Sequence, residues 1–112
     1  DQIRHAAVAY LAAPGYAQMF ERAGFGEVVA MARDGAHPRQ LLAAVPDELA
    51  AAVGAVGDRD QVLARLDAYG RAGADQVVIV PSATDDDPAG EATLRSIAAA
   101  RLERSAPADA PA

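Results

Sequence analysis

The hydrophobic and polar positions between residues 57 and 81 predict a helix followed by a strand. Asp58 stands three residues before Gln61 at the start of the helix, which is the spacing of a capping box. Gly73 stands where a residue with positive φ would end the helix. The apolar positions that recur at helical spacing and predict its buried face are Val62, Leu63, Leu66 and Tyr69.

The predicted strand covers about residues 75–80 and is dominated by the β-branched run from Val77 to Val80. Four apolar residues without polar alternation are typical of a strand covered on both faces, as in a parallel sheet flanked by helices. Pro81 ends the run because proline cannot donate to a β-ladder. A single strand leaves both of its edges unpaired, so the neighbouring strands are expected to come from elsewhere.

The rest of the chain predicts six or seven helices in total. Tyr16, Met19, Phe20 and Ala23 recur at helical spacing, and the face that they form is the most aromatic part of the chain. The last helix is expected to bury Leu94, Ile97, Ala98 and Leu102. The predicted boundaries are residues 2–11, 14–24 and 27–33, a short helix after Pro38, residues 46–57, and a last helix that Asp87 caps and that Pro88 begins.

Composition narrows the class of protein. A chain of 112 residues with 52% hydrophobic content has room for one domain or part of one. The net charge of −6 argues against a nucleic-acid surface, and the absence of cysteine removes disulfides and thiolate metal sites. Because no apolar run reaches the roughly 18 residues of a membrane helix, a cytoplasmic protein is expected, with no membrane or nucleic-acid partner.

The residues that could carry chemistry favour structural roles. His5 lacks a second ligand four residues later, and His37 precedes a proline in a turn. The acidic run 85–87 lacks the glycine and distal glutamate of a calcium loop, so no metal site is predicted. Asp58 and Asp60 suit a cap and a helix dipole better than acid–base catalysis. No nucleotide-binding glycine spacing and no nucleophile elbow are present.

The loop after the predicted strand contains the candidate binding residues Pro81, Ser82 and Thr84. In parallel α/β proteins, ligands gather beyond the carboxyl ends of the strands, where this loop would lie. A surface loop far from any chemistry is the alternative interpretation.

Several stretches together resemble the C-terminal portion of luciferase-like flavin oxidoreductases, and most closely the branch that uses the deazaflavin coenzyme F420. The resemblance covers residues 2–100, and its most specific part runs from Pro46 to Pro81. The stretches are YLAAPGY at 10–16, RAGF at 22–25, VPDEL at 45–49, GD at 57–58, AGAD at 72–75 and VP at 80–81.

This resemblance implies an α/β fold in which the chain is the C-terminal part of a TIM-like (β/α)8 barrel. Residues 76–80 would be its eighth strand, and the helix after Pro88 would cover it. Residues 1–104 would belong to the barrel domain, and the Ala/Pro-rich residues 105–112 would be a disordered tail. The principal partner would then be the missing N-terminal part of the barrel.

The same resemblance implies redox chemistry on paired donors, by monooxygenation or hydride transfer, with coenzyme F420 or alternatively FMN as cofactor and a small molecule as substrate. The residues that hold the cofactor ring in the family lie on earlier strands, so the catalytic residues are unknown here. Only Pro81, Ser82 and Thr84 are expected near the cofactor. The isolated chain is expected to be inactive, and the whole protein could form a homodimer.

A different class of function also fits the pattern. The chain could be a self-contained acidic helical module that binds a protein partner through the apolar face of Tyr16, Met19 and Phe20. In that case residues 76–81 would be an edge for strand addition. A small cofactor-free enzyme has little support because no nucleophile and base are paired in the sequence.

Overall fold

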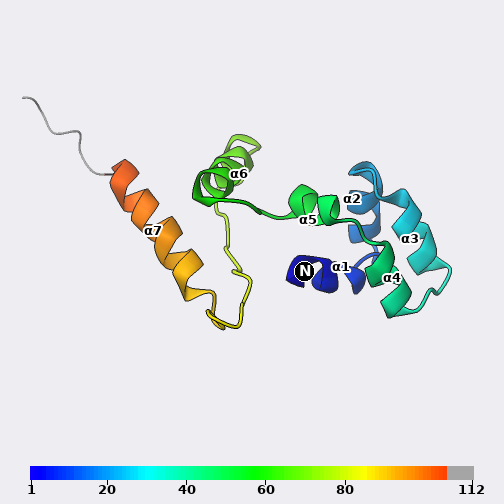
Figure 1. Ribbon diagram of the computed structural model, residues 1–112. Helices are drawn as coiled ribbons and strands as arrows, with labels where there is room; N and C mark the ends of the chain where they lie inside the picture. Colours follow the sequence, from blue (N-terminus) through cyan, green and yellow to red (C-terminus); the bar gives the residue numbers. More distant parts are fainter. Residues whose placement is uncertain (106–112) are drawn as a thin grey trace, which may run out of the picture. The chain divides into compact units, whose positions relative to one another are not determined.

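The computed structural model describes residues 1–105 and is all-helical in that range (Figure 1). The prediction of six or seven helices is confirmed, with seven helices among residues 1–105. Ser105, the first residue of the predicted tail, ends the last helix, and residues 106–112 lie outside the described part. The helices are α1 (Gln2–Val8), α2 (Tyr16–Arg22), α3 (Gly26–Arg33), α4 (Pro38–Ala44), α5 (Asp47–Val53), α6 (Arg59–Arg71) and α7 (Glu91–Ser105).

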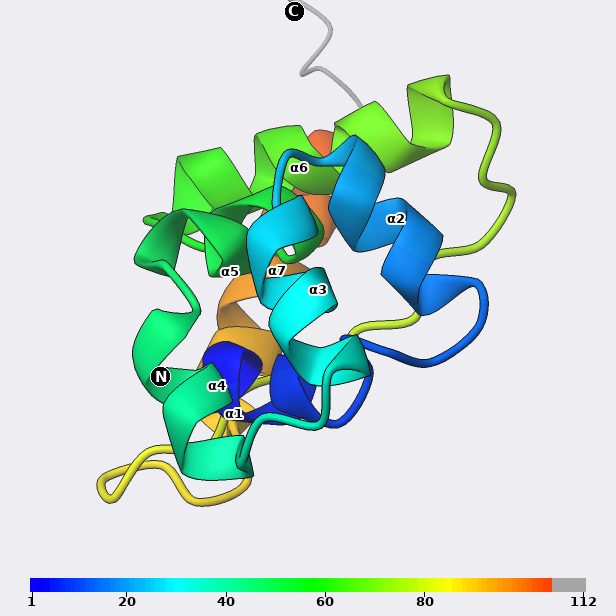
Figure 2. The same cartoon turned by 90° about the vertical axis from the view of Figure 1, so that its right-hand side faces the viewer.

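The chain divides into two compact units. Unit 1 is Asp1–Val56 and contains α1 to α5, and unit 2 is Gly57–Ala112, with α6 and α7 in its described part. Within unit 1, α2 and α3 lie side by side, as Figures 1 and 2 both show. Helix α1 packs against α4 and α5, and α3 packs against α4. No described helix combines the length and the apolar character needed to cross a bilayer.

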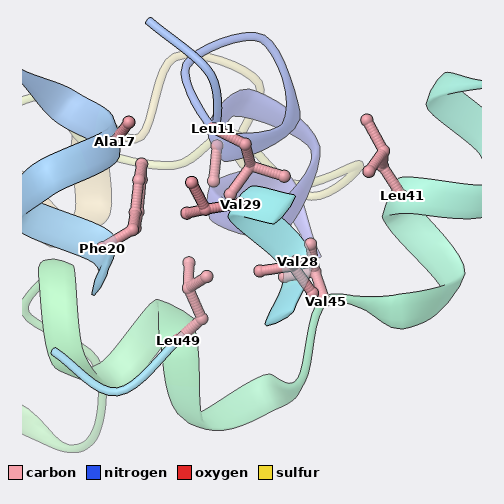
Figure 3. Close-up of a cluster of buried hydrophobic side chains, with 9 residues drawn as sticks. Leu11, Ala17, Phe20, Val28, Val29, Leu41, Val45 and Leu49 are labelled. Carbon is pink, nitrogen blue, oxygen red and sulfur yellow. The ribbon is translucent and has the colours of Figure 1, made fainter. Parts of the chain in front are cut away.

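Unit 1 is held together by one apolar core to which all five helices or their flanking loops contribute. Leu11 and Leu49 are fully buried, and their side chains point toward Phe20 and Val29 in Figure 3. Apolar burial is the main favourable term in folding, and short helices are marginally stable by themselves. We therefore attribute the stability of the five short helices to this cluster. Its buried members are Ala7, Leu11, Ala17, Phe20, Val28, Val29, Leu41, Val45 and Leu49.

Arg4 links the start of unit 1 to the end of α4. Its Nη2 atom donates to the carbonyl oxygen of Leu42 at 2.9 Å, and its Nε atom donates to that of Val45 at 3.1 Å. Carbonyl groups at a helix C-terminus lack partners within the helix, and a cation satisfies them well. The guanidinium also pairs with Asp1 at 3.0 Å and with Asp47 at 3.5 Å.

The aromatic face predicted for α2 is divided between the core and the surface. Phe20 is buried with 2% exposure, whereas Tyr16 and Met19 are 49% and 41% exposed. Helix α2 has seven residues, and its buried side is set by Ala17 together with Phe20. In so short a helix the apolar residues fit more than one face, and the packing of the neighbouring helices decides between them.

Unit 2 pairs α6 with α7 over a small core. The predicted capping box is confirmed: the Gln61 amide donates to Asp58 Oδ1 and the Asp58 amide donates to Gln61 Oε1, both at 2.8 Å. Gly73 follows α6 and has a φ of +110°, which confirms the predicted positive φ at the end of this helix. The buried residues are Leu63, Leu66, Ile97 and Ala100, with Val62, Tyr69, Val77 and Ile79 packed against them.

The predicted α/β fold with a parallel strand at about residues 75–80 is wrong for this structure. In the part of the chain that the structure describes there is no strand and no sheet, and therefore no segment of a TIM-like barrel. Residues 76–80 are extended but have no neighbouring strand to pair with. A β-strand exists only as a member of a ladder, so the apolar run alone does not produce one.

The last helix begins later than predicted. Helix α7 starts at Glu91, and Pro88 lies in the preceding turn. Asp87 is nevertheless its cap, because its Oδ1 and Oδ2 accept hydrogen bonds from the amides of Glu91 and Ala92, both at 2.9 Å. Of the predicted buried face only Ile97 is buried, while Leu94 and Leu102 are 40% and 73% exposed.

Candidate functional site

The extended segment of residues 76–80 runs between α6 and the loop before α7 (Figure 1). Val77 and Ile79 are partly buried and pack against the core of unit 2. Val78 and Val80 point the other way and are 79% and 87% exposed. Successive side chains of an extended chain alternate between two faces, so one face is anchored on the helices and the other is an open apolar surface.

The backbone of this segment is open as well. No backbone hydrogen bond joins residues 76–80 to another segment of the described chain. Pro81 favours the extended conformation at Val80, because the proline ring disfavours helical geometry in the preceding residue. The segment therefore offers peptide donors and acceptors in a conformation that suits pairing.

The loop of residues 81–90 has a defined shape. The Thr84 amide donates to the carbonyl oxygen of Asp87 at 3.0 Å, and the Asp87 amide donates to that of Thr84 at 3.1 Å. The Asp87 amide also lies 3.1 Å from Thr84 Oγ1, which accepts from it. Together with the cap that Asp87 gives to α7, these bonds tie the loop to the start of the helix.

Gly90 closes the loop against Pro81. It is buried and has a φ of +66°, a conformation that favours glycine. A Cβ atom at this position would lie 2.5 Å from Cβ of Pro81 and 2.7 Å from its Cγ. The close approach of Pro81 thus depends on the missing side chain of Gly90, which the sequence analysis did not single out. A glycine directly before the charged start of α7 was the available signal.

The three candidate binding residues lie close together in sequence but differ in their surroundings. Pro81 is half-buried against Gly90, Ser82 is exposed, and Thr84 is exposed but uses its hydroxyl within the loop. Their predicted contact with a cofactor stays a prediction. Val78 and Val80 were expected to be covered, and they are the site feature that the sequence analysis missed.

A hollow of about 690 Å³ lies beside the beginning of the extended segment and is lined in part by Gln76 and Val77. Arg71 and Arg101 contribute positive charge, and Asp67 and Asp75 contribute negative charge. Asp67 pairs with Arg104 at 2.9 Å. The balanced charges favour neither an anion nor a cation, so the hollow does not define a ligand.

The two histidines take part in local hydrogen bonds. His37 precedes α4, and its Nδ1 accepts from the Arg39 amide at 3.2 Å, while Gln40 Oε1 accepts from the His37 amide at 3.1 Å. His5 Nδ1 lies 3.0 Å from the carbonyl oxygen of Asp1. Within residues 1–105, no three His, Cys, Asp or Glu side chains are grouped so as to hold a metal ion.

Comparison with known proteins gives no relative for this site. No family model, no curated protein and no solved structure matches the chain. The site is therefore defined by its own geometry: an apolar extended segment with an open backbone, leading into a closed loop at Pro81. An open apolar face of this kind can be covered by another polypeptide surface.

Proposed function

We propose that this chain is the C-terminal part of a cytoplasmic luciferase-like oxidoreductase that uses coenzyme F420, with FMN as the alternative cofactor. The observation that carries the proposal is the open apolar face formed by Val78 and Val80. Exposed apolar surface of this kind marks a site that another protein surface covers. The stretches that resemble the family, above all residues 46–81, support the same proposal.

In this proposal the chain assists the reaction and does not perform it alone. The extended segment docks on the N-terminal part of the protein, which holds the cofactor. The loop from Pro81 to Thr84 is thereby brought close to the cofactor. That body supplies the residues that hold the cofactor ring and orient the small-molecule substrate. The reaction is a hydride transfer or a monooxygenation on paired donors, and the separate chain is inactive.

The experiment compares the chain alone with the chain co-expressed with the polypeptide encoded upstream of Asp1. Each sample is titrated with reduced coenzyme F420 and with FMN, and binding is followed by cofactor fluorescence. We expect no binding by the chain alone and binding of one cofactor by the complex. A complex that forms but binds neither cofactor contradicts the oxidoreductase function.

A second candidate function is an acidic helical interaction module, and an aromatic patch in unit 1 favours it. The rings of Tyr10 and Tyr16 lie 4.8 Å apart at 43°, and both are about half exposed, while Met19 in the same helix as Tyr16 is 41% exposed. Residues 6–20 carry no charge, so two acidic copies could meet here without facing like charges. Sedimentation of the wild type and of Tyr16→Glu tests this. Association that the substitution abolishes favours the module, and a monomeric wild type contradicts self-association through this patch.

A further inference from the structure

We infer that Asp34 is a site of spontaneous modification, at which aspartate converts to isoaspartate through a cyclic imide formed with the amide of Gly35. The two residues directly follow α3, with Asp34 as the C-cap of the helix and Gly35 as the next residue. The turn that they form controls the rate, because its hydrogen bonds hold the reacting atoms apart. The inference does not depend on the proposed function.

The first argument is the residue that follows each aspartate. Ring closure requires the next amide nitrogen to approach Cγ of the aspartate, and a side chain on the next residue hinders that approach. Position 34 is the one place in the sequence where glycine follows aspartate. The sequence contains no asparagine, the other residue that forms the same ring. The reaction is therefore least hindered at this one position.

The second argument is the freedom of the Asp34 carboxylate. Asp34 is exposed, and no hydrogen bond or ion pair holds its carboxylate within the described chain. Other aspartates are engaged: Asp58 and Asp87 accept hydrogen bonds from helix amides, and Asp67 pairs with Arg104. The carboxyl group of Asp34 is thus free to turn toward its own backbone.

The third argument is the way in which α3 ends. The Gly35 amide donates to the carbonyl oxygen of Ala32, and the Ala36 amide donates to that of Met31, both at 3.1 Å. These two bonds form a Schellman motif, which requires a residue with positive φ, and Gly35 has a φ of +81°. The glycine that ends the helix is therefore also the residue that makes Asp34 reactive.

The same turn restrains the reaction. Asp34 has a ψ of 1°, at which the Gly35 nitrogen is turned away from the Asp34 side chain. Ring closure therefore requires the peptide unit between the two residues to rotate, which breaks the bond from Gly35 to Ala32. Helix ends open locally at a lower free energy than the core, so the rotation takes place in transiently opened molecules.

The chemistry requires only water. The Gly35 nitrogen loses its proton and bonds to Cγ of the protonated Asp34 carboxyl group, and one carboxyl oxygen leaves as water. A water molecule then attacks one of the two ring carbonyl carbons and breaks its bond to nitrogen. Attack at the main-chain carbon of Asp34 gives isoaspartate, whereas attack at Cγ restores aspartate.

The product alters the connection between α3 and α4. Its main chain runs through Cβ and Cγ of the modified residue and is longer by one carbon atom, so it no longer matches the hydrogen bonds of the turn. The helices on either side contribute Val28, Val29 and Leu41 to the core of unit 1. Modification should therefore weaken unit 1 and leave the core of unit 2 unchanged.

The test follows the full chain during incubation in neutral buffer, with a synthetic peptide of residues 29–40 as the unfolded reference. Peptide mapping with electron-transfer fragmentation distinguishes isoaspartate from aspartate of equal mass. We expect isoaspartate at Asp34 and not at Asp75, which is also exposed but is followed by glutamine. Conversion in the chain should be at least about tenfold slower than in the peptide, because it requires opening of the turn.

Matched variants separate the turn from the rest of the chain. Phe20→Ala loosens the core of unit 1 and should speed conversion at Asp34 by at least about threefold, whereas Leu66→Ala in unit 2 should leave the rate unchanged. Asp34→Glu should abolish the reaction, since its longer side chain would form a larger ring that closes slowly. Incubated wild type should unfold at a lower urea concentration than fresh wild type, and Asp34→Glu should not change.

Several results overturn the inference. These are a chain that holds no isoaspartate at position 34 after prolonged incubation, equal rates in the chain and the peptide, and conversion at Asp75 as fast as at Asp34. An unchanged rate in Phe20→Ala also overturns it. If Phe20→Ala does not fold, its rate should equal that of the peptide, and a slower rate would contradict control by the turn.

Discussion

Unit 1 buries nine apolar side chains in one core, whereas the described part of unit 2 buries four. Both units expose large apolar residues, but only in unit 2 do two of them, Val78 and Val80, exceed three-quarters exposure. The two units have similar numbers of residues, so chain length does not explain the difference. The helices of unit 1 pack around one shared core, whereas one face of the extended segment in unit 2 is exposed.

Unit 2 has, in its described part, the smaller apolar core of the two units. A small domain buries only a limited fraction of its surface, and four buried side chains are a small core. Covering Val78 and Val80 with a partner would bring unit 2 closer to the apolar burial of unit 1. The core of unit 1, in contrast, already draws on all five helices and their flanking loops.

The largest expected effect is the loss of a core aromatic ring in unit 1. Phe20→Ala should lower the free energy of unfolding of unit 1 by about 3–5 kcal/mol, because it leaves a cavity among buried side chains. The matched change in unit 2, Leu66→Ala, should cost about 2 kcal/mol, since a smaller core collapses more easily around the gap. Residue-resolved hydrogen exchange measures both. Equal acceleration of α6 amides by Phe20→Ala would refute two separate cores.

The next effect concerns the loop that joins the extended segment to α7. Gly90→Ala should destabilise unit 2 by about 2 kcal/mol, because the new methyl group would collide with Pro81 and the backbone has positive φ. Thermal unfolding followed by circular dichroism measures the change. Gly70→Ala in α6 is the control: it has open space around it and should raise stability by up to about 1 kcal/mol. An unchanged melting temperature in Gly90→Ala would show that Gly90 does not pack closely against Pro81.

A smaller effect is expected at the start of α6. Asp58→Ala should cost about 1 kcal/mol because it removes the acceptor for the Gln61 amide. Asp60→Ala, which removes only a first-turn charge, should cost less than about 0.5 kcal/mol. Urea titrations of the two variants measure the difference. Identical losses would mean that charge, and not the cap, stabilises this helix.

The smallest effect is expected from exposed ion pairs. Asp67→Asn breaks the 2.9 Å pair with Arg104, and Glu21→Gln breaks the 2.7 Å pair with Arg33 in unit 1. Their side chains are 40–54% exposed, so each substitution should cost less than about 1 kcal/mol, and the cost should shrink at high salt. Denaturation at two salt concentrations tests this. A much larger loss in unit 2 would show that ion pairing, rather than apolar packing, distinguishes the units.

Local features of the fold could be predicted from the sequence. The number of helices within residues 1–105, the capping box of Asp58 and Gln61, and the stop at Gly73 are all confirmed. The capping box and the stop depend on residues within one turn of the helix end, so the local sequence contains the necessary information. The buried positions Leu63 and Leu66 follow from the same short-range pattern.

Features that depend on distant partners could not be predicted. The valine-rich segment was assigned to a parallel strand, but an apolar run does not reveal whether a neighbouring strand is present. The helical spacing of Tyr16, Met19 and Phe20 did not reveal that the packing of α2 buries only Phe20 of the three. The candidate loop was located correctly as a loop, yet its closure by Gly90 on Pro81 depends on residues nine positions apart. Only the folded backbone brings these two residues together.

Asp87 has a consequence for how this loop could change during evolution. Its amide and carbonyl close the turn with Thr84, while its carboxylate caps α7. The side chains of Asp85, Asp86 and Ala89 are exposed, and within the described chain they form none of these bonds. Substitutions at these three positions would therefore leave the backbone conformation of the loop unchanged. The surface next to Ser82 could vary in sequence during evolution, provided that Asp87 and Gly90 were retained.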